Sequence, residues 1–170
     1  MSNIVFRPMR AGDVARVAEL ERICFRTPWS YSSLLGELSN DVAYYIVAEL
    51  EGTVIGYAGE WIMFDEAHMT NIAVDPGYRG RGVARRMIIA LMREALSRGG
   101  ERMTLEVRET NHTAQRLYAS LDFAYAGTRK HYYTDTGENA LILWNDCIIA
   151  TYEREMKAAM HFADKEDTNA

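Results

Sequence analysis

The chain has 170 residues, of which 48% are hydrophobic and 25% are charged, values typical of a water-soluble globular domain. Its net charge of −5 argues against general nucleic-acid binding, which requires a basic surface. Two distant cysteines, no apolar run long enough to cross a bilayer and no signal peptide favour a cytoplasmic protein without a membrane partner. We expect one domain over residues 1–150 and a C-terminal extension over 151–170.

The first half of the chain predicts a strand, two helices, a hairpin and a further strand. Residues 4–9 alternate apolar and polar side chains, which is typical of a strand. An amphipathic helix follows with Asp13 as its N-cap, and Ser30 caps a second, shorter helix. The apolar runs VAYYIVAEL and TVIGYAGEWIMF flank a turn and predict a hairpin. Residues 67–74 form the next predicted strand, which Asp75 and Pro76 end.

The second half predicts alternating helices and strands. An apolar stripe at helical spacing runs through residues 84–96, and Gly99 and Gly100 end that helix. MTLEVR is a predicted strand, followed by a helix that Asn111 or Thr113 caps. Residues 123–127 and 140–144 are the last predicted strands, and the tail predicts a helix from Thr151 with a disordered end, ADKEDTNA. The order indicates an α/β fold with a mixed sheet and helices on both faces.

The stretch YRGRGVARRM, between a strand and a helix, is typical of an anion-binding turn. The free N–H groups at a helix start attract phosphate, and glycines let a ligand approach the backbone closely. Arg79, Arg81 and Arg85 add positive charge. The P-loop and Rossmann motifs are excluded, because neither GK[ST] nor the third glycine of GxGxxG is present. The turn alone leaves open a plain helix entry with a solvated basic patch.

Several segments together resemble one enzyme family. Arg79, Gly82 and Ala84 fit R-x-x-G-x-A, which resembles the acetyl-CoA pyrophosphate loop of the GNAT N-acetyltransferase superfamily. LEVRETNHTAQRLYASLDF resembles the LEVRxxNxxAxxLYxxxGF block of the RimI-type ribosomal-protein alanine N-acetyltransferases, and CFRTPWS resembles their PWS segment. The resemblance covers residues 4–145. The chain departs from the pattern at Asp122, where the block has glycine, and in a longer tail beyond Asn145.

The resemblance implies the GNAT fold, with a central, mostly antiparallel, twisted sheet and helices on both faces. It implies transfer of an acetyl group from acetyl-CoA to the N-terminal α-amine of a protein, by direct attack in a ternary complex. The implied acceptor is the alanine of a small-subunit ribosomal protein. We expect no metal, no nucleic-acid partner, and a monomer or weak homodimer.

Two residues carry the chemistry that the resemblance implies. Glu106 of LEVR is the general base, acting directly or through water, and Tyr118 of RLY donates a proton to the leaving sulfur. Strand alternation by itself favours a solvated side chain at Glu106, opposite Met103, Leu105 and Val107. Helical spacing by itself favours a packing role for Tyr118.

The resemblance also implies the binding residues. The cofactor contacts are the turn, Asn111 (which is also a candidate helix cap) and the backbone of the preceding strand: Ile72, Ala73, Val74, Arg79, Gly80, Arg81, Gly82, Val83, Ala84, Arg85 and Asn111. Trp29 helps to form the acceptor groove, with Tyr132 and Tyr133 on its other side. A loop tryptophan is equally often part of a small core.

Two other functions remain open from the sequence. A GNAT enzyme that acetylates a small-molecule amine shares the same loop, although the LEVR and PWS segments favour a protein acceptor. A non-catalytic acetyl-CoA-binding module also shares the loop, but the presence of both Glu106 and Tyr118 disfavours it.

Overall fold

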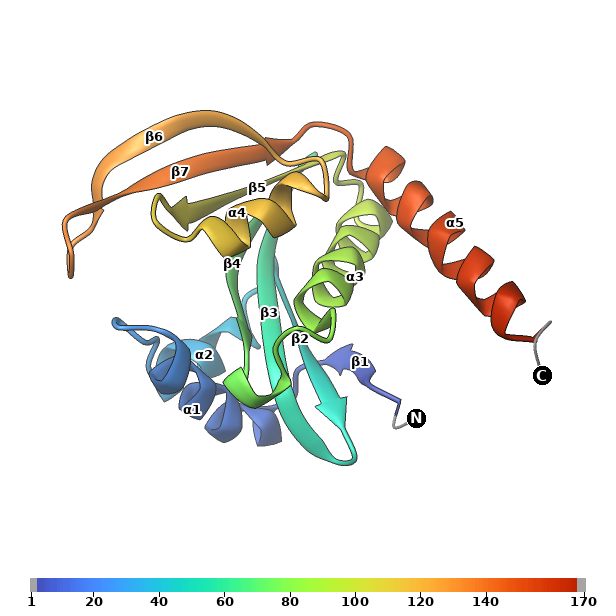
Figure 1. Cartoon of the computed structure of the whole chain (residues 1–170). Helices are drawn as coiled ribbons and strands as arrows, with labels where there is room; N and C mark the ends of the chain where they lie inside the picture. The colour runs from blue at the N-terminus through green and yellow to red at the C-terminus, as the bar shows by residue number, and fades with distance from the viewer. Residues whose placement is uncertain (1–2, 168–170) are drawn as a thin grey trace.

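The computed structural model describes residues 3–167, with side chains through His161. Seven strands form one sheet in the order β1-β2-β3-β4-β5-β7-β6 (Figure 1). All neighbouring strands are antiparallel except β4 and β5. The strands are β1 (Val5–Pro8), β2 (Ala43–Leu50), β3 (Thr53–Met63), β4 (Glu66–Val74), β5 (Arg102–Arg108), β6 (Ala124–Tyr133) and β7 (Glu138–Asn145). This confirms the predicted mixed, mostly antiparallel sheet.

Helices cover both faces of the sheet, as predicted. They are α1 (Val14–Cys24), α2 (Tyr31–Glu37), α3 (Val83–Ser97), α4 (His112–Ala119) and α5 (Ile148–Asp167), with short 3-10 turns at Ala11–Asp13 and Pro76–Tyr78. One core lies between the sheet and α1 and α2, and includes Val17, Leu20 and Leu34. The other lies between the sheet and α3 and α4. The apolar stripe of α3, which connects β4 to β5, packs against the sheet in this second core.

The cap predicted at Ser30 is present, whereas the Asp13 side chain makes no cap hydrogen bond to α1 and accepts the Arg10 backbone N–H instead. Ser33 donates its N–H to the Ser30 side chain at 3.0 Å, so Ser30 caps α2. The apolar stripe of α3 is fully buried at Met87, Ile88 and Leu91. Each such side chain contributes roughly 2 kcal/mol of burial free energy. The packing of this stripe against the sheet therefore fixes the position of α3.

The structure differs from the sequence prediction at the C-terminal end. β6 continues to Tyr133 rather than ending at Gly127. α5 begins at Ile148, before Thr151, and it continues to Asp167, through part of the end that we expected to be disordered. Residues 168–170 of that end lie outside the described residues. Within residues 3–167, no helix has the length and apolar character that a membrane crossing needs.

Candidate active site

The sheet opens between its two parallel strands. β4 pairs with β5 only at Glu66, Ala67 and His68, opposite residues 102–104. Beyond His68 the strands diverge: β4 stays paired with β3, and β5 stays paired with β7 (Figure 1). Within the described chain, residues 69–74 of β4 and 105–108 of β5 therefore have no strand on their facing edges. Backbone groups on such an edge are available to an extended ligand.

The predicted backbone contacts lie on this free edge. Ile72, Ala73 and Val74 are paired on their other side with β3. The carbonyl of Val74 already accepts a hydrogen bond from Arg79 Nε at 3.1 Å. Arg79 therefore links the end of β4 to the turn before α3, and it fixes where the free edge meets that turn.

Glu106 lies on β5 beside the opening. Met103, Leu105 and Val107 are buried on the other face of the strand, so the predicted alternation is confirmed. The Glu106 side chain is only 10% exposed, so the solvated side chain that alternation by itself favoured is not found. Its Oε2 lies 2.6 Å from His68 Nε2, and its Oε1 lies 3.3 Å from Arg129 Nη2.

These partners decide the charge of Glu106. Burial alone raises the pKa of its carboxyl group, but the hydrogen bond and charge of His68, with the charge of Arg129, outweigh burial and lower it. The carboxylate is thus ionised at neutral pH and lies partly buried, which is the state that a general base requires.

Sequence reasoning missed the role of His68. It is the last β4 residue that pairs with β5, so it stands where the strands separate. Its neighbours Ala67 and Met69 are buried in the core under α3. Alternation along one strand could not show this, because His68 and Glu106 share a face only through the parallel register of β4 and β5.

Tyr118 lies on the opposite face of β5 from Glu106. It is 5% exposed, packs in the core that contains Leu105 and Val107, and meets the ring of Phe123 edge to face at 5.9 Å between centroids. The packing role expected from spacing is therefore present. Burial raises the pKa of its hydroxyl, and the charge of Tyr133 raises it further. The hydroxyl consequently keeps its proton at neutral pH.

The tyrosine pair lies at the end of β6. The rings of Tyr132 and Tyr133 meet edge to face at 5.2 Å, and the Arg108 guanidinium stacks 3.9 Å from the Tyr133 ring centre. Burial raises the pKa of Tyr133 to about 12, with the charge of Glu106 among the smaller causes. Tyr133 therefore interacts electrostatically with both Glu106 and Tyr118, one on each face of β5.

Trp29 is held by a buried carboxylate. The backbone N–H of Trp29 donates to Glu21 Oε2 at 2.7 Å, and the Trp29 side chain packs against the core under α1 and α2. Glu21 also accepts from the Tyr57 hydroxyl and from Asn71 Nδ2. The structure thus supports a packing role for Trp29, and Glu21 ties the PWS segment to β4.

The turn before α3 has the geometry of an anion-binding loop. Gly80 and Gly82 have φ values of +76° and +73°, which favour glycine, and an added Cβ at either would meet nothing within 4 Å. In the described chain, the first backbone bond of α3 runs from the Arg86 N–H to the Gly82 carbonyl, at 3.1 Å. The N–H groups of residues 80–85 have no backbone acceptor among residues 3–167. The loop therefore fits a diphosphate.

The side chains around the loop have separate roles. Val83 is buried and Ala84 packs against the core, so each offers the ligand only its backbone. The Arg81 guanidinium stacks 5.2 Å from the Tyr78 ring centre. Asn111 accepts the Ala114 N–H at 3.1 Å, so its capping role is present.

Arg85 has a partner that the sequence did not predict. Its Nε and Nη2 donate to the two carboxylate oxygens of Glu155 on α5, at 2.9 and 2.8 Å. Its Nη1 donates to Ser120 Oγ at 2.8 Å. The expected contribution of the Arg85 charge to a diphosphate site is therefore opposed by a carboxylate. Among the described residues, the backbone N–H of Arg85 has no acceptor.

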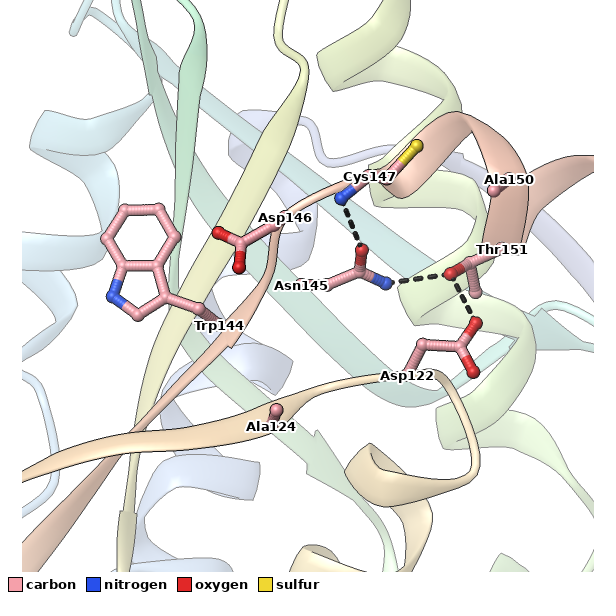
Figure 2. Close-up of a pocket in the computed structure, with 8 residues that line it drawn as sticks. All are labelled: Asp122, Ala124, Trp144, Asn145, Asp146, Cys147, Ala150 and Thr151. Atoms are coloured by element: carbon pink, nitrogen blue, oxygen red, sulfur yellow. Dashed lines mark hydrogen bonds between the residues drawn. The ribbon is translucent and has the colours of Figure 1, made fainter.

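A surface depression lies away from these residues. It is formed where the α4–β6 turn meets the start of α5, as Figure 2 shows, and it is lined by Asp122, Ala124, Trp144, Asn145, Asp146, Cys147, Ala150 and Thr151. None of these is a predicted site residue. The predicted residues that border the opening between β4 and β5 are Glu106 and the edge from Ile72 to Val74.

Known proteins share this architecture. The sequence pattern of the Acetyltransferase (GNAT) family matches residues 14–123. A Bacillus subtilis protein, provisionally named ribosomal protein bS18-alanine N-acetyltransferase, is 42% identical over 139 residues, which are 81% of this chain and 92% of the relative.

Solved structures agree. The ribosomal-protein-S18-alanine N-acetyltransferase of Escherichia coli has a TM-score of 0.77 and 30% identity, covering 84% of this chain and 92% of the other. Arabidopsis thaliana NAA60, solved in complex with acetyl-CoA, has a TM-score of 0.77 at 17% identity, covering 84% and 98%, and shares the fold. On the family pattern, the close relative and the observed fold, the chain belongs to the GNAT family of acetyltransferases.

Proposed function

We propose that the protein transfers an acetyl group from acetyl-CoA to the N-terminal α-amine of a protein, and that the acceptor is the N-terminal alanine of ribosomal protein bS18. The observation that carries the proposal is the position of Glu106, held by His68 and Arg129 at the point where β4 and β5 separate. The names of the Bacillus subtilis and Escherichia coli relatives support the acceptor.

The cofactor residues follow from the loop and the free strand edge. The unpaired N–H groups of residues 80–85 hold the diphosphate, and the free edge of β4 from Ile72 to Val74 pairs with the pantetheine arm. Asn111, at the start of α4, is a further contact. Bound acetyl-CoA supplies a thioester whose carbonyl carbon is electrophilic.

The protein residues manage the protons. Glu106 Oε accepts the proton that the acceptor amine loses as its nitrogen bonds to the acetyl carbon, directly or through one water. An α-amine has a pKa of about 8, so a carboxylate is a sufficient base at neutral pH. Tyr118 holds a proton at its hydroxyl, on the other face of β5, and that proton goes to the thiolate released when the C–S bond breaks. Burial keeps the proton there until this step.

The acceptor groove lies between the PWS segment and the end of β6. Trp29 is fixed by Glu21 on one side, and Tyr132 and Tyr133 form the other side. Tyr133 is the groove residue that interacts with both Glu106 and Tyr118.

The test uses peptides. The protein is incubated with acetyl-CoA and a peptide that carries the N-terminal sequence of bS18, and mass spectrometry follows a gain of about 42 Da on the α-amine. The matched control is the same peptide with its α-amine blocked and its lysines intact. A panel of small amines is run in parallel. Acetylation of the free peptide alone is expected, and turnover of only the small amines would show that the protein is a small-molecule acetyltransferase.

A further inference from the structure

The two places where the chain departs from the family pattern meet in the structure. Asp122 stands where the pattern has glycine, with φ +63° in the turn that ends α4. The N–H of Phe123 bonds to the Tyr118 carbonyl and that of Asp122 to the Ala119 carbonyl, each at 3.1 Å, a turn that favours glycine. A side chain in this position is unfavourable by itself, so its contacts have to explain it.

Those contacts are with the extended tail. Asp122 Oδ2 accepts from Thr151 Oγ1 at 2.7 Å and from Arg154 Nη1 at 2.5 Å, both on α5. Arg154 Nη2 donates to the Ser120 carbonyl at 3.2 Å, which caps the end of α4. The Asp122 carboxylate, which a glycine would not provide, is thus the point at which α5 docks. The Asp122 substitution and the longer tail therefore form one structural unit.

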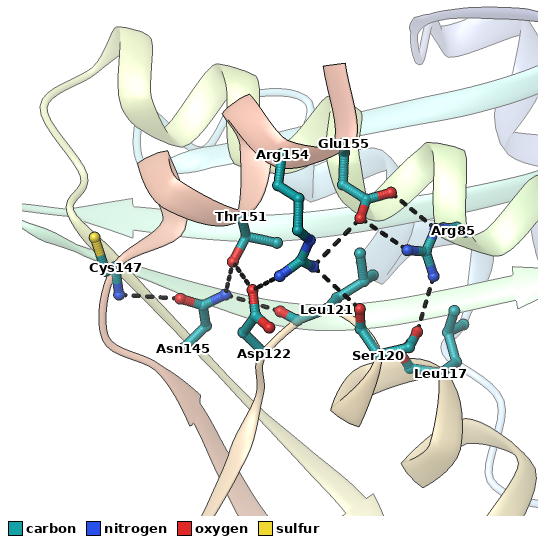
Figure 3. Close-up of polar contacts among 10 residues, drawn as sticks. All are labelled: Arg85, Leu117, Ser120, Leu121, Asp122, Asn145, Cys147, Thr151, Arg154 and Glu155. Atoms are coloured by element: carbon teal, nitrogen blue, oxygen red, sulfur yellow. Dashed lines mark hydrogen bonds and ion pairs between the residues drawn. The ribbon is translucent and has the colours of Figure 1, made fainter. Parts of the chain in front are cut away.

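Docking brings the next residue of α5 to the cofactor loop. Figure 3 shows Glu155 between Arg154 and Arg85, with Arg85 reaching on to Ser120. The Glu155 side chain is 10% exposed, and it binds the Arg85 guanidinium through both oxygens. A two-point guanidinium–carboxylate pair is among the stronger polar contacts of proteins.

This pair changes the charge of the loop. Arg79 is bound to the Val74 carbonyl and Arg81 stacks on Tyr78, and neither has a carboxylate partner among the described residues. Of the three loop arginines, Arg85 alone is paired with an acid in the part of the chain that the structure describes. A diphosphate and a carboxylate bind guanidinium in the same way, so they compete for it.

We propose that α5 sets the affinity of the loop for the cofactor's diphosphate, and that Glu155 does so by withholding the Arg85 guanidinium from it. This inference rests on the proposed use of acetyl-CoA, but not on the identity of the acceptor. Glu155 is a positioning residue that acts through Arg85, and Asp122 is the residue that holds α5 in place.

The test is a calorimetric titration with coenzyme A, which needs no acceptor and no turnover. Glu155→Gln keeps the shape of the side chain and removes its charge. We expect the dissociation constant to fall about threefold or more at low salt, as for one unit charge within a Debye length. The gain should shrink as salt rises. Arg85→Ala should weaken binding, and the double variant should return near the wild-type value.

Two further variants complete the test, one as a control and one as a second way to release Arg85. Glu153→Gln removes the same charge from an exposed position on α5, outside this network, and should leave binding unchanged. Asp122→Gly removes the docking point without straining the turn, because glycine accepts φ +63°. Asp122→Gly should lower the dissociation constant for coenzyme A, as Glu155→Gln does. Thermal unfolding of each variant establishes that it is folded.

The outcomes are separable from the acceptor question. Unchanged or weaker binding by a folded Glu155→Gln protein, an equal gain in Glu153→Gln, or no binding by the wild type would overturn the proposal. A protein that binds as expected but acetylates no alanine peptide would contradict the proposed acceptor and leave the role of Glu155 standing.

Discussion

Two strand carboxylates, the partly buried Glu106 and the fully buried Glu60, have opposite surroundings. Glu106 lies on β5 beside the opening of the sheet, with a histidine and an arginine at its oxygens. Glu60 lies on β3 with no exposed surface, on the same side as Ala58 and Ile62, which pack in the core under α3. Neither oxygen of Glu60 has a hydrogen-bond partner within the described residues.

These surroundings shift the pKa values of the two carboxyl groups in opposite directions. Burial raises the pKa of Glu60 well above its usual range, and the charge of Glu94 adds to this, so the group is protonated. Burial acts on Glu106 in the same direction, but the hydrogen bond and charge of His68, with the charge of Arg129, overcome it and lower its pKa. Burial alone thus favours the protonated carboxyl group, and burial beside these partners favours the carboxylate. This contrast is the physical reason to assign the base to Glu106.

The largest expected effect is from Glu106→Gln. Glutamine keeps the shape but takes no proton from the amine, so kcat/KM for the alanine peptide should fall about 10²–10⁴-fold. Peptide acetylation followed by mass spectrometry measures this. Glu60→Gln is the matched control, since it replaces a protonated acid by a neutral amide, and it should keep activity within about twofold. Equal activity of the two variants would end the distinction between the carboxylates.

The next effect is from Tyr118→Phe, on the other face of β5. Phenylalanine preserves the contact with Phe123 and removes only the hydroxyl proton. Because a thiolate of pKa about 8.5 leaves without full protonation, the expected loss in kcat is smaller, about 10–100-fold. The KM for acetyl-CoA should not change. A raised KM with unchanged kcat would instead assign Tyr118 to cofactor packing.

Local patterns predicted the residues that act within one element. The Ser30 and Asn111 caps follow from residue type and spacing, and the face of Glu106 follows from alternation along one strand. β6 was predicted too short because most of its residues are exposed, so no buried alternation marks its second half.

Contacts between distant elements could not be predicted. His68 and Glu106 are 38 residues apart and meet only through the parallel register of β4 and β5. Arg85 and Glu155 are 70 residues apart, and their pairing depends on where α5 docks. The family resemblance stops before α5, so it carried no information about that pair.

A smaller effect is expected from His68→Gln, which removes a partner that lowers the pKa of Glu106. With burial and Arg129 remaining, the Glu106 pKa should rise. A base with a higher pKa is protonated at higher pH, so the acid limb of the kcat/KM profile should move upward, by about one pH unit. Rates measured from about pH 3 to 7 test this, because the lowered pKa of Glu106 places the wild-type limb below the ordinary glutamate value of about 4.3. An acid limb that stays in place would mean that His68 does not control the charge of Glu106.

The smallest effect on activity and the clearest on stability is from Glu60→Gln. The folded protein keeps the Glu60 proton to higher pH than the unfolded chain, whose glutamates titrate near 4.3. The folded state then binds more protons, so the wild type loses stability as pH rises above that value, by up to about 1.4 kcal/mol per pH unit. Glutamine has no such loss, and the advantage of the variant in thermal unfolding should grow from pH 5 to 8. A constant difference across that range would mean that Glu60 is ionised in the folded protein, and the contrast with Glu106 would disappear.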